Sequence, residues 1–120
     1  MRLLKNVVAA LKSSQALTDK LYSGADSIRH LRMLDARKNP HIVYSIISDV
    51  PALSGDDGEI MRRVTVRIHI ITSRGEYFPI ADAVEDVMRS LKWRRVQTLE
   101  HMEDGQEILT IDYMNVGISF

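Results

Sequence analysis

Hydrophobic and polar residues alternate most regularly over residues 61–72 (MRRVTVRIHIIT). Successive side chains of a strand point to opposite faces, so a period of two predicts a strand with one buried face. A shift of one residue would expose every apolar side chain, so the pattern also fixes which face meets the core. It assigns Val64, Val66, Ile68 and Ile70 to the buried face, and Arg63, Thr65, Arg67 and His69 to the opposite face.

The spacing becomes helical over residues 79–91 (PIADAVEDVMRSL). Proline is favoured at the first position of a helix, where its missing N–H costs nothing, so Pro79 marks the start. The apolar stripe contains Ile80, Ala83, Val84, Val87, Met88 and Leu91. We therefore expect Val84, Val87, Met88 and Leu91 to share a core with the buried face of the preceding strand.

The N-terminal segment has a second helical pattern, which predicts a helix over about 2–22. Ser13 and Ser14 interrupt the apolar stripe, so we expect a break near Ser13, with Ser14 capping a second short helix. Gly24 follows as the expected end of that helix.

Three further segments are predicted to be strands. Residues 41–50 (HIVYSIISDV) are rich in β-branched and aromatic residues, and residues 93–102 and 107–118 flank a hairpin turn at Asp104-Gly105. The strand at 107–118 is apolar on both faces, which predicts that both are covered, by its own domain or by a neighbouring subunit. Residues 24–40 fit neither period, and we expect an irregular connection there that has room for a short strand.

Together these elements predict one domain, residues 1–120, of the α+β class. The expected fold is an about four-stranded, mainly antiparallel sheet with the N-terminal helix and the helix at about 79–91 packed on one face. An acidic loop over residues 51–59 (PALSGDDGE) is expected to join the first two strands.

Charge and composition limit the classes of function that the chain can have. Lys and Arg together number 16, as do Asp and Glu, so the formal net charge is zero. Proteins that bind phosphate backbones usually have a basic excess, and this chain has none. It also has no cysteine, which excludes disulfides, thiolate catalysis and thiolate metal sites.

The motifs of the sequence predict no catalytic constellation, metal site or cofactor site. The four histidines have no partner at metal-ligand spacing, and Asp56, Asp57 and Glu59 lack the alternate spacing and closing glutamate of a calcium loop. No phosphate-binding glycine motif or nucleophile elbow occurs. We therefore expect a protein that is not an enzyme. An active site assembled from residues far apart in sequence stays open as an alternative.

A nucleic-acid interface is one alternative from a different functional class. Arg62-Arg63 and Arg94-Arg95 lie on predicted strands, and Tyr77 and Trp93 are aromatic neighbours of the kind that stack on bases. Adjacent strand residues point to opposite faces, so each arginine pair should be split across the sheet.

The order of these features resembles the tail-terminator, or tail-completion, proteins of long-tailed phages and prophages. The resemblance spans essentially the whole chain and rests on patterns of hydrophobicity and turns. They are the helix segment LKSSQALTDKLYSG, the strand start NPHIVY, the variable acidic loop, the strand VRIHIIT, the segment YFPIADAVEDVMRSL and the closing hairpin MEDGQEILTIDYMNVGISF.

The resemblance implies a structural role. Such proteins form a hexameric ring that caps the finished tail tube, stops its polymerisation and joins it to the head. The implied partners are other copies of the chain, the tail tube protein and a head-completion or connector protein. DNA passes through the ring without specific binding, and no membrane is involved. The implied location is the head–tail junction of the virion, after assembly in the host cytoplasm. A head-side connector or head-closure protein also works as a ring at this junction and stays open as an alternative.

A closed ring needs two different patches on each subunit. The chain offers an acidic patch, Asp56, Asp57 and Glu59, and a strand face bearing Arg63, Arg67 and His69. We expect these two patches to meet between neighbouring subunits, because complementary charges set the register of an interface.

Overall fold

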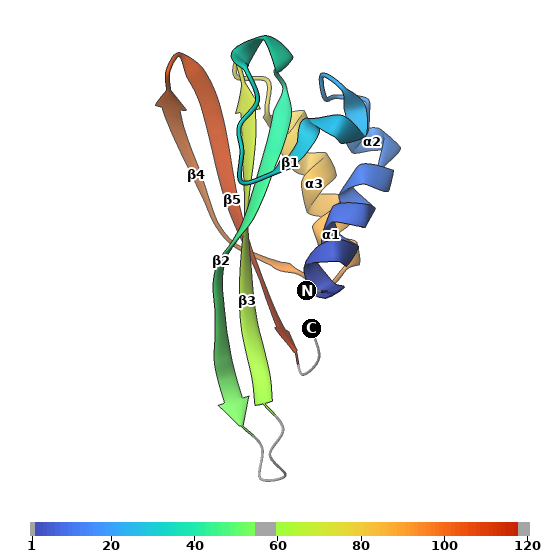
Figure 1. Cartoon of the computed structure of the whole chain (residues 1–120), viewed down its shortest axis with the longest axis vertical. Coiled ribbons are helices and arrows are strands. Elements are labelled where there is room, and N and C mark those ends of the chain that lie inside the picture. Colours follow the sequence, from blue (N-terminus) through green and yellow to red (C-terminus); the bar gives the residue numbers. More distant parts are fainter. Residues whose placement is uncertain (1, 55–59, 118–120) are drawn as a thin grey trace.

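A computed structural model describes residues 2–54 and 60–117, which form one α+β unit (Figure 1). Within this part of the chain the elements are α1 (Arg2–Ser13), α2 (Gln15–Thr18), β1 (Ile28–His30), β2 (His41–Ser54), β3 (Ile60–Thr72), α3 (Phe78–Ser90), β4 (Arg94–Glu103) and β5 (Gln106–Gly117). Two short 3₁₀ helices, Gly24–Ser27 and Ala36–Lys38, lie in the connection before β2.

The described strands make one five-stranded sheet in the order β1-β2-β3-β5-β4. β1 is parallel to β2 and all other neighbours are antiparallel. Helices α1, α2 and α3 gather on one side of the sheet (Figure 1). The expected class and helix placement agree with this structure, but the expected count of about four strands was too low. The fifth strand, β1, lies in the segment 24–40, where the sequence left room for a short strand, but its three residues are too few to produce a readable period.

The core lies between the helices and β3. Val64, Val66, Ile68 and Ile70 are completely buried, so the register read from the alternation is confirmed. Val84 and Met88 of α3 are buried with them, whereas Val87 and Leu91 are half-buried at the margin of the same cluster.

The N-terminal helix breaks where the sequence predicted. The Leu17 N–H donates to Ser14 Oγ (3.3 Å), so Ser14 caps α2 and helps to place the buried Leu17. The expected end at Gly24 was wrong, because α2 ends at Thr18. Gly24 instead begins a 3₁₀ turn with a φ of 57°, a left-handed conformation that glycine adopts without strain.

β2 is longer than expected. The prediction ended this strand at Val50, yet β2 continues through Pro51 to Ser54, so that β2 and β3 extend past the helices as an arm (Figure 1). Register shifts between Ile46 and Ser48 and again after Pro51 interrupt its pairing with β3. Proline is tolerated here because no described strand pairs with the other side of β2 at this position, so that its missing N–H breaks no ladder there.

The closing hairpin agrees with its prediction to within one residue at each end. Asp104 and Gly105 have φ angles of 51° and 78°, and a tight hairpin turn requires positive values at both central positions. β5 contributes Leu109, Ile111 and Tyr113 to the core.

Candidate assembly surface

The sheet face opposite the helices, here called the open face, carries most of the polar residues that sequence analysis selected. The pairing register places four neighbouring rows across it. From the arm toward the hairpin turn these are Val50–Arg63–Val116, Ser48–Thr65–Met114–Arg94, Ser45–Arg67–Asp112–Gln97 and Val43–His69–Thr110–Leu99. Arg63, Arg67 and His69 therefore share one face, as predicted.

An ion pair occupies the centre of the open face. Arg67 Nε and Nη2 donate to Asp112 Oδ1 (2.8 Å) and Oδ2 (3.0 Å), and Gln97 Nε2 also donates to Oδ2 (2.6 Å). Asp112 is only 1% exposed. Burial alone would raise its pKa, but the hydrogen bonds from Arg67 and Gln97 outweigh that effect and lower the pKa. The charge of Arg67 is thus balanced within its own chain.

His69 is likewise engaged internally. Its Nδ1 lies 2.8 Å from Thr110 Oγ1. Burial lowers the His69 pKa, and the positive charge of Arg67 lowers it further, so the ring is mainly neutral at pH 7. Arg63, by contrast, is exposed between Val50 and Val116, which makes it the outward cation of the predicted set.

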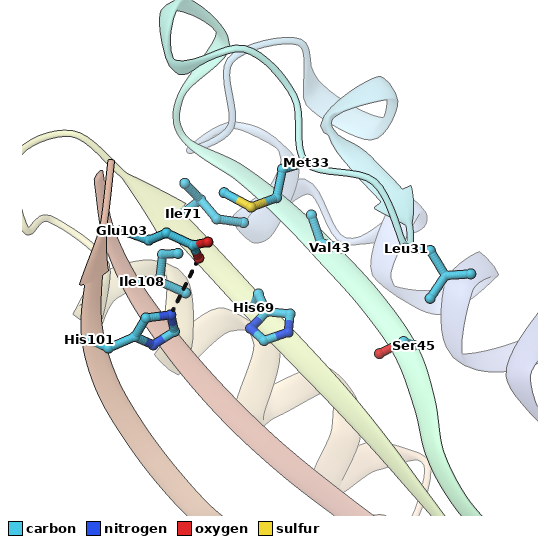
Figure 2. A pocket seen from close by; sticks show the side chains of 9 residues that line it. All are labelled: Leu31, Met33, Val43, Ser45, His69, Ile71, His101, Glu103 and Ile108. Atoms are coloured by element: carbon cyan, nitrogen blue, oxygen red, sulfur yellow. Dashed lines mark ion pairs between the residues drawn. The ribbon is translucent and has the colours of Figure 1, made fainter. Parts of the chain in front are cut away.

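A pocket of about 260 Å³ lies on the open face near the hairpin turn (Figure 2). Its floor is the buried cluster Val43, Ile71 and Ile108, and exposed side chains from the connection before β2 approach it, among them Met33. His101 Nε2 and Glu103 Oε2 face each other at 3.8 Å on its rim. An apolar floor with a polar rim suits a packing contact.

Metal binding has no support in the described residues, which contain no group of three or more His, Cys, Asp or Glu side chains able to hold an ion. The acidic half of the predicted interface, Asp56, Asp57 and Glu59, lies outside the described residues. The same holds for the segment that was compared with a calcium loop.

Sequence reasoning missed the partners of Arg67. Asp112 stands between Ile111 and Tyr113 in β5, and Gln97 lies in a strand that alternates poorly. Only the register, which sets Arg67 opposite Asp112 and Asp112 opposite Gln97, reveals the cluster. Asp112 is the one charged residue between Ile108 and Gly117, and this was the one available signal.

His41 was also missed as a structural residue. It is fully buried, accepts a hydrogen bond at Nε2 from the Leu34 N–H (2.9 Å) and meets Asn39 Oδ1 at Nδ1 (2.7 Å). The Asn39 amide donates to Ser73 Oγ and Gln106 Oε1, and the Asn39-Pro40 peptide bond is cis. Burial lowers the His41 pKa to about 4, so a neutral ring anchors the connection before β2 to the sheet.

The aromatic and arginine residues behind the nucleic-acid alternative do not all lie on one surface. Trp93 and Tyr77 are buried, so neither ring is available to stack on a base. Arg62 points to the helix side, where its Nε donates to Asp49 Oδ1 (3.0 Å), while Arg63 lies on the open face. The predicted splitting of this arginine pair is confirmed.

No helix of the described chain has the length and apolar character required to cross a membrane.

Comparison with protein-family models and with curated proteins finds no match. Among solved structures, the chain resembles one from the virion of a native gene transfer agent (GTA) particle. The TM-score is 0.52 at 13% identity, and the match covers 92% of each chain. At this identity the likeness establishes a shared fold across nearly the whole molecule.

Proposed function

We propose that this chain is a structural protein of a phage-like virion and, within that class, a tail terminator. In this role a hexameric ring of the chain caps the tail tube, ends its polymerisation and presents a surface to the head. The observation that carries the proposal is the fold shared over 92% of both chains with a GTA virion component. The narrower role is supported by the order of features along the sequence, which resembles that of tail-terminator proteins.

The electrostatics of the molecule are compatible with a conduit for DNA. A ring through which DNA passes should not hold the phosphate backbone, and a neutral chain lacks the basic excess that such binding requires. On the open face, Asp112 balances Arg67 and His69 is mainly neutral, so two of the predicted cationic positions present little net charge.

Within the proposed ring, we assign the charged subunit contact to Asp56, Asp57 and Glu59 of one copy and the open face of the next. Arg63 is the leading partner because it is exposed, whereas Arg67 and His69 are engaged by Asp112 and Thr110. A contact between two different patches is the kind that closes a ring.

The proposed partners are the tail tube protein on one side of the ring and a head-completion or connector protein on the other. A head-side connector ring is the nearest competing role. Electron microscopy of the protein mixed with purified tail tubes separates the two, because a terminator caps tube ends and a connector leaves them bare.

The nucleic-acid alternative is tested by titration with duplex DNA at low salt. The proposal predicts no binding below micromolar concentrations. Sub-micromolar affinity that falls steeply with added salt would instead favour a nucleic-acid-binding domain.

A further inference from the structure

The sheet has an uncovered edge at β4. Among the described residues this strand pairs only with β5 and is the last in the sheet, and all ten of its residues are exposed. Three are large and apolar: Val96 is 54% exposed, Leu99 46% and Met102 68%. An edge of this kind offers unpaired backbone N–H and C=O groups to another strand.

The opposite edge is also open along part of its length. β1 covers β2 only from Ile42 to Tyr44, and no strand of the described chain pairs with that side of β2 from Ser45 onward. Ile47 and Val50 are exposed there. An apolar hollow of about 270 Å³ opens beside Tyr44 and is lined by Leu4, Lys5, Val8 and Ala9 of α1.

The two edges have compatible directions. β2, β3, β5 and β4 are antiparallel in turn, so β4 runs opposite to β2. A head-to-tail repeat of the sheet therefore brings β4 of one copy antiparallel to β2 of the next. From these edges we propose that, in the ring put forward above, β4 pairs with residues 45–50 of β2 in the neighbouring copy. This inference rests on the proposed function, because it assumes a ring of identical copies.

The charges along the two edges complement each other. β4 begins with Arg94 and Arg95 and carries Glu100 and Glu103 near its end. In the antiparallel arrangement its basic end lies toward Asp49 of β2, which also accepts a hydrogen bond from Arg62 of its own chain. Its acidic end lies toward the β1 side of the neighbour, where Arg29 and Arg32 are exposed. Opposite charges face each other at both ends, which favours this orientation over the reverse.

Local irregularities explain why these edges need not pair indiscriminately. β4 has a register shift between Arg95 and Gln97, and β2 has one between Ile46 and Ser48. Pro51 lacks the N–H that would extend the ladder further. Bulges and edge prolines are devices that limit unspecific strand pairing, so the contact is restricted to a partner with the right geometry.

The chain contains no cysteine, so disulfide trapping can test this contact without background. The panel combines one cysteine in β4, at Val96, Thr98 or Leu99, with one in β2, at Ile47, Ser48 or Val50. Facing Cα atoms of antiparallel strands lie about 4.5–5.5 Å apart, within reach of a disulfide. Each variant is oxidised alone and after mixing with tail tubes, and the products are separated on denaturing gels.

At least one β4–β2 combination should give covalent ladders beyond the dimer, because each copy then has two different cross-linking strands. The single-cysteine variants should stop at the dimer. A matched control with cysteines on the exposed helix surface, Lys12→Cys with Asp86→Cys, should give no ladder.

Failure of the edge model can be told apart from failure of the proposed function. If rings cap the tubes but no β4–β2 combination gives a ladder, or the helix control gives an equal one, the edge pairing is wrong and the tail role stands. If ladders form but the tubes stay uncapped, the edge pairing stands and the tail role is wrong. If neither forms, both are wrong.

Discussion

Asp112 holds together the polar centre of the open face. Its carboxylate receives two hydrogen bonds from Arg67 and one from Gln97 while it is almost inaccessible to water. Three residues on three adjacent strands thereby fix the side-chain arrangement of this surface. An ordered surface is a suitable platform for another subunit.

Removing the charge of Asp112 should destabilise the fold. In Asp112→Asn the guanidinium of Arg67 loses its ionic partner, so we expect a loss of about 1–3 kcal/mol in the free energy of unfolding. Urea denaturation at pH 7 measures this loss. Arg89→Gln is the matched control, since it removes an exposed ion pair with Glu85 and should change stability little. A loss no greater in Asp112→Asn than in this control would contradict the structural role.

His41 should make the protein sensitive to mild acid. Burial depresses its folded-state pKa to about 4, below the ordinary value of about 6.5. The unfolded chain therefore binds a proton that the folded chain resists, so the stability is fully present above pH 6.5. It is lost as the pH falls from about 6.5 toward about 4, by up to about 3 kcal/mol.

Urea denaturation at pH 7 and pH 4.5 measures this acid sensitivity. His41→Gln should be less stable than the parent at pH 7 but should lose less stability on acidification. An equal loss in both proteins would assign the effect to other groups.

At the scale of the elements, strong periodicity decided what could be predicted. The strand at Ile60–Thr72 and the helix at Phe78–Ser90 bury one regular face each, so their side-chain pattern carries their structure. The position of β1, within a segment that was expected to have room for a short strand, and the length of β2 could not be predicted for a different reason. Three residues give no period, and Pro51 is compatible with a strand only because no described strand pairs with that side of β2 there, which is a property of the whole sheet.

The packing of α3 on the sheet is tested by a pair of truncations. Val84 is completely buried, and Val84→Ala should cost about 2–3 kcal/mol through lost transfer free energy and a cavity. Val87 is half-buried, so Val87→Ala should cost about 1 kcal/mol. Thermal and urea unfolding of both variants measure the difference. A larger loss at Val87 than at Val84 would contradict the orientation of the helix.

At the scale of the whole molecule, the sequence predicted that Arg63, Arg67 and His69 share a face, because alternation determines it. It could not predict that Asp112 neutralises Arg67, since that contact joins residues 45 positions apart and depends on the pairing of β3 with β5. The two edges that the described strands leave uncovered are likewise properties of the strand order, which no local pattern contains.

The charged half of the proposed ring contact can be tested by Asp56→Lys with Asp57→Lys. Loop charges contribute little to stability, so the double variant should fold with an unchanged melting temperature. It should place severalfold fewer rings on tail tubes at physiological salt, because two attractive contacts become repulsive. Assembly equal to that of the parent would remove this acidic segment from the interface.

The central claim is that copies of this chain close into a ring on the end of a tail tube. Electron microscopy of purified tail tubes, incubated with the protein and then supplied with free tube subunits, tests it most directly. The account predicts a six-fold ring at one end of each tube and no further growth from that end. Tubes that continue to elongate at the same rate, with bare ends and the protein left in solution, would contradict it.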